Sequence, residues 1–201
     1  MPESTNTGDD RRMTTGKVRL SFPYLFKPRQ RENQDPKFSV MLLIPKSDKA
    51  TLKRLRDLEQ KVLEENASSV FGIKSGTPTL GQRGIAPSIM KDADEDGTAE
   101  DYPEREGMVY MTVNCNTDFP PKVVDRNLEP IIDQSEVYSG VHARVSLQAF
   151  AYKRDEKKGV SFGLGNVQVY TGDGDPLGGG GRSAEADFEP IEDEGGGDDL
   201  L

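Results

Sequence analysis

The sequence predicts a mainly β domain with one helix and long loop insertions. Three observations support this fold class. Residues 139–170 contain two limbs in which apolar side chains recur at every second position, as in an antiparallel hairpin. Residues 17–22 and 108–115 alternate in the same way. Only one segment, which follows Pro45, has the spacing of an amphipathic helix.

Composition favours one folded domain with tails. Of the 201 residues, 33% are hydrophobic and 30% are charged, which is too polar for the whole chain to form a single core. We expect a disordered N-terminal segment over residues 1–15, a folded domain over 16–172 and a Gly-rich acidic C-terminal tail over 173–201. No segment is apolar enough to span a bilayer or to act as a signal peptide, so a soluble intracellular protein is expected.

Charge is distributed in blocks. The net charge is -9, yet residues 173–201 hold ten acidic residues and one arginine, so residues 1–172 sum to zero. Residues 91–106 alone carry a net charge of -6, which leaves the rest of the domain mildly basic. A basic domain with an acidic end indicates an interaction tail.

The first predicted strand, residues 17–22, continues into rings and cations. Phe22, Tyr24 and Phe26 keep the two-residue spacing and are followed by Lys27, Arg29 and Arg31. Rings beside cations are typical of surfaces that bind single-stranded nucleic acid. The alternative is a hydrophobic segment under the sheet followed by a solvated loop.

Residues 37–44 predict a central strand that is buried on both faces and ended by Pro45. Ser47 and Asp48 can then cap a helix of about 18 residues. Its apolar face is expected to hold Leu52, Leu55, Leu58, Val62 and Leu63. Its basic face could contact phosphate, but a solvated helix face is the favoured interpretation.

Residues 72–107 predict a long loop insertion, either a lid or a flexible segment. Asp92, Asp94 and Asp96 resemble the opening of a calcium loop, but the twelfth position is Pro103 where such a loop needs a bidentate glutamate. A solvated acidic loop is the favoured interpretation. We predict no metal and no cofactor.

Two short strands are predicted next, over residues 108–115 and 122–125. Cys115 fits a small buried residue. As the only cysteine it excludes an intramolecular disulfide, and with His142 as the only histidine a zinc site is excluded. A catalytic pair of these two residues is disfavoured.

The hairpin over residues 139–170 presents two unlike faces. Its first limb places one set inward: Val141, Ala143, Val145, Leu147, Ala149 and Ala151. The other set faces outward: His142, Arg144, Ser146, Gln148, Phe150 and Tyr152. Residues 153–159 (KRDEKKG) predict a basic turn, and a phase shift over 163–166 predicts a bulge of the kind that bends a small barrel.

Residues 19–28 (RLSFPYLFKP), 136–152 (EVYSGVHARVSLQAFAY) and 158–170 (KGVSFGLGNVQVY), together with the acidic end, resemble the phage-encoded single-stranded DNA-binding proteins. The resemblance covers about residues 14–172. It implies an OB-fold-like five-stranded antiparallel barrel, and a monomer or homodimer in the host cell cytoplasm with no membrane contact. It also implies sequence-independent binding of single-stranded DNA in phage replication, recombination and repair.

The resemblance further implies that the tail recruits phage or host replication proteins, such as a polymerase, helicase or nuclease, and competes with DNA. Tails of this kind often end in an aromatic residue, whereas this one ends in two leucines. The residues expected to meet a partner are Phe188, Glu192, Asp193, Glu194, Asp198, Asp199, Leu200 and Leu201.

Candidate DNA-binding residues combine rings for stacking with cations for phosphates. They are Arg19, Phe22, Tyr24, Phe26, Lys27, Arg29, Arg31, Lys122, Arg144, Phe150, Tyr152, Lys153, Arg154, Lys157 and Lys158. No catalytic residue is predicted.

Two other functions stay open at this point. One is a phage assembly or interaction module that does not bind DNA. The other is a metal-dependent nuclease that uses Asp92, Asp94, Asp96 or Glu106, although these acids lie in one loop and do not come from several strands.

Overall fold

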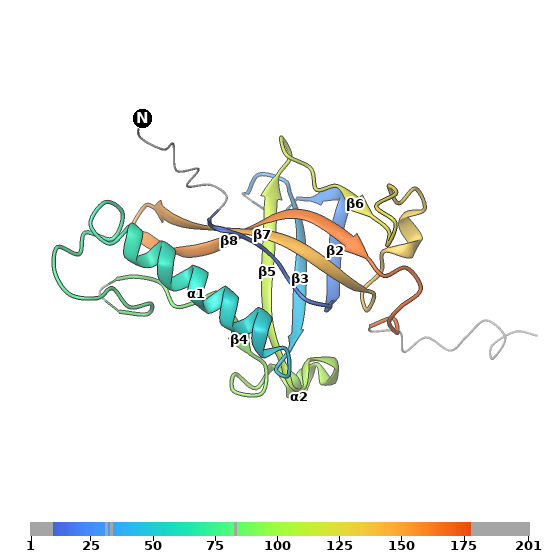
Figure 1. The fold of residues 1–201 in the computed structure, drawn as a ribbon, viewed down its shortest axis with the longest axis horizontal. Coiled ribbons are helices and arrows are strands. Elements are labelled where there is room, and N and C mark those ends of the chain that lie inside the picture. The colour runs from blue at the N-terminus through green and yellow to red at the C-terminus, as the bar shows by residue number, and fades with distance from the viewer. Residues whose placement is uncertain (1–9, 31, 33, 83, 178–201) are drawn as a thin grey trace, which may run out of the picture.

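Five long strands close into a barrel in the computed structural model, which describes residues 10–30, 32, 34–82 and 84–177 (Figure 1). They are β2 (Val18–Arg29), β3 (Lys37–Pro45), β5 (Met108–Asn116), β7 (His142–Arg154) and β8 (Lys157–Val169). The pairing order is β7-β2-β3-β5-β8, and the β7–β8 pair closes it. The predicted five-stranded OB-like barrel is confirmed. All pairs are antiparallel except β5–β8, which is parallel.

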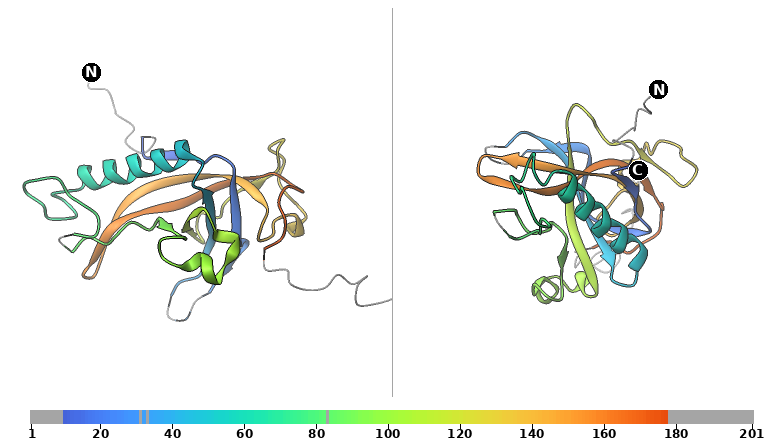
Figure 2. Two further views of the ribbon diagram at one scale, coloured as in Figure 1. Left: turned by 90° about the horizontal axis from the view of Figure 1, so that it is seen from below. Right: turned by 60° about the vertical axis from the view of Figure 1, so that its left-hand side comes forward.

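Short elements decorate this barrel. Three are short strands: β1 (Arg12–Thr14) pairs with β7, β4 (Lys91–Asp92) pairs with β5, and β6 (Val123–Val124) pairs with β8. The others are the short helix α2 (Thr98–Asp101) and the 3-10 turns η1 (Pro103–Arg105) and η2 (Gln134–Glu136). The one long helix of the described residues, α1 (Lys49–Glu65), lies along β7 and β8 (Figures 1 and 2). No helix within the described ranges combines the length and apolar character that crossing a membrane requires.

Helix α1 begins as its sequence predicts. The Asp48 carboxylate accepts a hydrogen bond from the backbone N of Thr51 at 3.0 Å, which satisfies one of the free donors of the first turn. The five predicted apolar residues are all buried. Burial of such a side chain contributes roughly 1.5 to 3 kcal/mol, so this face fixes the helix on the barrel.

The β7–β8 hairpin alternates as predicted, and it contains the predicted bulge. Leu147 pairs with Leu164 and Val145 with Val167, so Gly165 and Asn166 stand opposite the single residue Ser146. The Ser146 hydroxyl accepts a hydrogen bond from Asn166 N at 2.7 Å. A Cβ on Gly165 would lie 2.3 Å from Ser146 Oγ, so only glycine fits there.

The turn of this hairpin is shorter than predicted. Only Asp155 and Glu156 lie between the strands, and Asp155 takes a φ of 52°. The basic residues assigned to a turn are therefore strand residues: Lys153, Arg154, Lys157 and Lys158. Regular pairing persists to the tip because Arg154 and Lys157 still face each other across the ladder.

The folded region is longer than predicted at both ends. Residues 10–15, predicted to be disordered, include β1, and Thr15 Oγ1 accepts a hydrogen bond from Val145 N at 3.0 Å. Residues 173–177 are also bonded to the barrel, with Leu177 N donating to Ser139 O at 2.6 Å. The remainder of both predicted tails, residues 1–9 and 178–201, lies outside the described residues.

The described part of the insertion packs on the barrel. Ile73, Ile85, Ala93 and Arg105 are buried, and Ala86 N donates to Lys158 O at 2.8 Å. This segment therefore contains short elements and buried contacts where the sequence predicted a lid or a flexible loop.

Residues 91–107, here called the acidic insertion, hold the calcium-like aspartates. Lys46 Nζ lies 2.5 Å from Asp92 Oδ1 and 2.7 Å from Asp94 Oδ2, and it lowers the pKa of both carboxyls. Asp96 instead accepts hydrogen bonds from Thr98 and Tyr110, which lower its pKa to about 2. The three carboxylates therefore face a lysine and hydroxyls, which does not favour the nuclease alternative.

Cys115 is half-buried, and its burial raises the pKa of the thiol. His142 Nδ1 lies 3.0 Å from Asp173 Oδ1, and no hydrogen bond joins His142 to Cys115 among the described residues.

Candidate nucleic-acid interface

A row of outward-facing residues crosses six strands. From β2 through β3, β5, β8 and β7 to β1, register pairing joins Tyr24, Ser39, Asn114, Gly163, Gln148 and Arg12 in that order. We call this the cross-strand row. None of its members is buried, whereas their strand neighbours Val113 and Leu147 are. Strands lie about 4.8 Å apart, so the row follows the curved barrel wall for about 24 Å of path, with a ring at one end and a guanidinium at the other.

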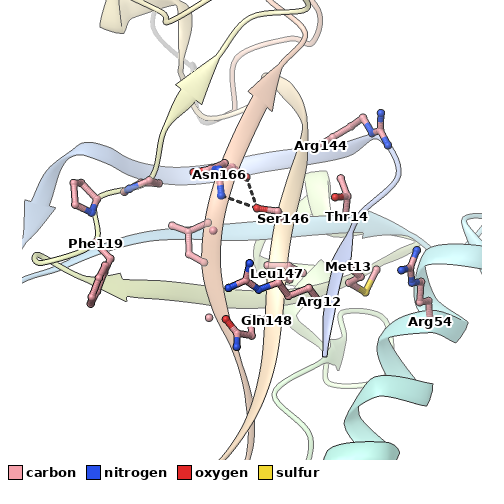
Figure 3. Close-up of a pocket in the computed structure, with 15 residues that line it drawn as sticks. Arg12, Met13, Thr14, Arg54, Phe119, Arg144, Ser146, Leu147, Gln148 and Asn166 are labelled. Atoms are coloured by element: carbon pink, nitrogen blue, oxygen red, sulfur yellow. Dashed lines mark hydrogen bonds between the residues drawn. The ribbon is translucent and has the colours of Figure 1, made fainter. Parts of the chain in front are cut away.

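The β1 end of the row opens into a groove of about 880 Å³, here called the arginine groove. Arg12 of β1, Arg54 of α1 and Arg144 of β7 line it (Figure 3). Within the part of the chain that the structure describes, none of these three guanidinium groups has a carboxylate partner within 4.0 Å. Three guanidinium groups without an internal counterion can neutralise phosphates.

A wall of one aromatic ring and two prolines, here called the aromatic wall, faces these arginines. Phe119, Pro120 and Pro121 follow β5, and the Phe119 ring is 77% exposed. Figure 3 shows Phe119 on one side of β7 and β8, and Arg54 and Arg144 on the other. An exposed ring across a groove from cations is a platform on which an unstacked base can lie.

The floor between the walls is formed by β7 and β8. Gly163 and Gly165 line it together with the polar side chains of Ser146, Gln148 and Asn166. Phe150 pairs with Ser161 and is 42% exposed, so its ring stands above this floor. Tyr152 is half-buried, since it lies over Gly159, where an added Cβ would meet its hydroxyl at 2.9 Å.

The other end of the row has a second set of rings and cations. The Arg29 guanidinium lies 5.0 Å from the centroid of the Tyr24 ring, and Arg29 pairs with Lys37. Lys37 lines two adjoining hollows of about 110 and 400 Å³. Arg154, at the end of β7, lines the larger one.

Comparison with known proteins identifies the family of this chain. Residues 11–201 match the family described as the single-stranded DNA-binding protein of Enterobacter phage Enc34. The chain belongs to this family. It is a class of binding proteins and not of enzymes, as the sequence predicted.

Solved structures of phage single-stranded DNA-binding proteins share the fold. The C-terminally truncated protein of bacteriophage Enc34 is 22% identical, with a TM-score of 0.66 over 84% of this chain and 90% of that chain. The Enc34 protein in complex with single-stranded DNA is 26% identical, with a TM-score of 0.65 over the same shares. The single-stranded DNA-binding protein gp2.5 of bacteriophage T7 is 15% identical, with a TM-score of 0.59 over 80% of this chain and 92% of that chain. None of the curated proteins matches.

The structure brings part of the predicted residue set together. Arg144, Phe150 and Tyr152 share the outer face of β7, and Tyr24 and Arg29 lie at the far end of the row beside the hollow that Arg154 lines. Four further cations are exposed but line none of the three hollows: Lys27, Lys122, Lys153 and Lys157. Arg31 and the eight predicted tail residues lie outside the described residues.

Other predicted residues have internal contacts. Arg19 donates hydrogen bonds to Gly140 O at 3.1 Å and Asp175 O at 2.6 Å, so it fastens the C-terminal end of the domain. Phe26 packs against the core. Lys158 Nζ donates to the backbone O of Phe71 at 2.5 Å.

Phe22 has an unusual backbone. It takes a φ of 48° at the register shift between Ser21 and Tyr24, and its N donates to Ser139 Oγ at 2.8 Å. Its ring is half exposed but lines none of the three hollows.

Sequence reasoning missed much of the arginine groove. Arg12 lies in the segment predicted to be disordered, Arg54 on a helix face interpreted as solvated, and Phe119 in a loop given no role. The one available signal was the ring of Phe119 between polar residues and two prolines. The register that brings these residues to β7 is not visible in any local pattern.

Proposed function

We propose that this protein binds single-stranded DNA without sequence specificity and without catalysis. The observation that carries the proposal is the cross-strand row, which leads from Tyr24 and Arg29 into the arginine groove. Family membership supports it, as does the likeness to the Enc34 protein in complex with single-stranded DNA.

In this mechanism the DNA phosphates bind to the arginine side chains of the groove. Arg12, Arg54 and Arg144 displace counterions, and the affinity falls with salt by about 0.7 log units per decade for each neutralised phosphate. Because these arginines have no carboxylate partner in the described structure, no ion pair between described residues has to break before DNA binds.

The DNA bases stack on the exposed rings and lie over the floor of the groove. Phe119, Phe150 and Tyr24 offer ring faces, and stacking contributes about 1 to 3 kcal/mol per base. Phosphate contacts and ring stacking do not depend on base identity, so binding that rests on them tolerates any sequence. A duplex keeps its bases stacked on one another, so it can use the cations but not the rings.

The acidic tail has a regulatory role in this proposal. Asp173 is held by Lys17 Nζ at 2.7 Å and by His142, so the tail leaves the barrel from a fixed point. A tethered acidic chain reaches an effective concentration on the order of millimolar near a basic groove. We propose that it competes with DNA and recruits replication, recombination and repair proteins of the phage or host in the host cytoplasm.

Two binding measurements test this function. The full chain should bind a long single-stranded oligonucleotide more tightly than its duplex, and absence of binding at low salt would favour the module that does not bind DNA. Truncation after Leu177, which keeps every described tail contact, should tighten binding at low salt and have little effect at high salt. Equal affinity of the truncated and full chains at low salt would remove the competing role from the tail.

A further inference from the structure

A hairpin projects from the end of the barrel that lies away from the β7–β8 turn (Figure 1). Residues 123–132 form it and are here called the β6 hairpin. β6 pairs with β8, Val124 bridges Pro130, and Ile131 N donates to Val123 O at 3.1 Å. These bonds fix the hairpin on the barrel.

Two aliphatic side chains of the β6 hairpin point into solvent. Leu128 is 69% exposed and Ile132 is 93% exposed. Neither is needed for the core, because the neighbouring Ile131 already packs against it. Single exposed apolar residues are common on protein surfaces, so these two indicate a contact surface only together with the turn that holds them and the charges beside them.

Leu128 is also held in a backbone conformation that a leucine rarely adopts. Its φ is 68°, in the left-handed region. The Asp125 carboxylate enforces this turn by accepting hydrogen bonds from Asn127 N at 2.8 Å and Glu129 N at 2.9 Å, and Leu128 N donates to Asp125 O. A residue kept in a strained conformation on a surface indicates a use for its side chain.

Three acidic residues lie close to Leu128 and Ile132 in the sequence and are here called the acidic rim. Glu129, Asp133 and Glu136 are exposed, and none of them has a cation partner among the described residues. Arg126 is the one basic residue of residues 125–136. One of its guanidinium nitrogens lies 3.7 Å from an Asp173 carboxylate oxygen, and its guanidinium lies 5.3 Å from the centroid of the Tyr170 ring. The rim therefore keeps its negative charge.

We propose that the β6 hairpin is a docking site for a second protein, one with an apolar pocket bordered by lysine and arginine. Charge decides the class of occupant, since an acidic rim repels phosphates and this chain's own acidic tail. A twofold contact between two such hairpins would bring like charges together. No residue of 125–136 lines the arginine groove, so partner and DNA can be bound together.

The test maps binding of a defined probe on the isotope-labelled full chain by NMR. The probe is an amphipathic helical peptide of leucine and lysine, about 18 residues or five turns long, and its control replaces every lysine with glutamate. Saturable shift changes are expected at residues 127–133 with the lysine peptide only. The double change Leu128→Ser with Ile132→Ser should weaken binding about tenfold or more, and Glu129→Gln with Asp133→Asn and Glu136→Gln should weaken it in the same direction. Unchanged melting and DNA affinity show that these variants are folded.

Three outcomes would overturn the proposal. Shift changes could be absent from residues 127–133, or confined to the tail. They could be equal for the two peptides. Concentration-dependent self-association that Leu128→Ser removes would instead assign the hairpin to contacts between copies of this chain. Because DNA affinity is measured separately, failure of the docking site and failure of DNA binding are distinguishable.

Discussion

The arginine groove and the acidic insertion are both rich in charged side chains, but they use them differently. In the acidic insertion Lys46 lies between two aspartates, and Arg105 is buried with its guanidinium 4.0 Å from the centroid of the Tyr102 ring. In the arginine groove the cations have no carboxylate partner among the described residues, and the opposing ring of Phe119 is exposed.

This difference shows that pairing of charges, and not their number, marks a binding surface. A net charge of -9 argues against a DNA-binding protein, and Asp92, Asp94 and Asp96 resemble the opening of a calcium loop, although the sequence favours a solvated acidic loop. In the structure Lys46, Thr98 and Tyr110 contact Asp92, Asp94 and Asp96 of the insertion, whereas the three groove arginines have no carboxylate partner among the described residues. Each prediction below changes one member of this comparison.

Removal of the aromatic wall should give the largest effect. Phe119→Ala is expected to weaken binding of single-stranded DNA by about 1 to 3 kcal/mol, or about 5- to 150-fold, because a stacking platform is lost. Tyr102→Ala in the acidic insertion is the matched control, an exposed ring that lies over Arg105, and it should leave affinity unchanged. Fluorescence titration measures both. Equal losses of DNA affinity in the two variants would contradict the claim that the arginine groove binds DNA and the acidic insertion does not.

Loss of the bulge glycine should reduce stability. Gly165→Ala places a Cβ 2.3 Å from Ser146 Oγ and 3.0 Å from Ser146 O, so the free energy of unfolding should fall by about 1 to 3 kcal/mol. Gly163→Ala is the control, since its Cβ would meet its nearest neighbours at 3.7 Å. Urea unfolding should separate the two variants, and a stable Gly165→Ala protein would contradict the close packing of the bulge.

A smaller effect is expected in the acidic insertion. Lys46 lowers the pKa of Asp92 and Asp94 below that of the unfolded chain, so their ionised forms stabilise the fold above about pH 4, and this contribution is lost as pH falls through the lowered values. Lys46→Met should therefore lower Tm modestly at neutral pH, and the difference should shrink on acidification. DNA affinity should not fall. A Tm difference that is independent of pH would refute the ion pairs as its cause.

Local patterns predicted the barrel but not the whole interface. Alternation over residues 141–151 and the cap at Asp48 are local, so the strands, the helix and the bulge could be predicted. The roles of Arg12 and Arg19 depend on contacts with strands more than a hundred residues away. Such pairing is set by closure of the barrel and leaves no local sequence pattern. The sequence therefore predicted the β7 residues of the interface, but not Arg12, Arg54 and Phe119.

The salt dependence of binding tests the central claim most directly. We expect the affinity of the full chain for a single-stranded oligonucleotide to fall with salt. Joint replacement Arg12→Gln, Arg54→Gln and Arg144→Gln should reduce the slope of log K against log salt by about 2, which is three phosphates at about 0.7 each. The paired cation Lys53 provides the control, since Lys53→Gln on the same helix should leave the slope within error. An unchanged slope in the triple variant would contradict the assignment of the arginine groove to DNA.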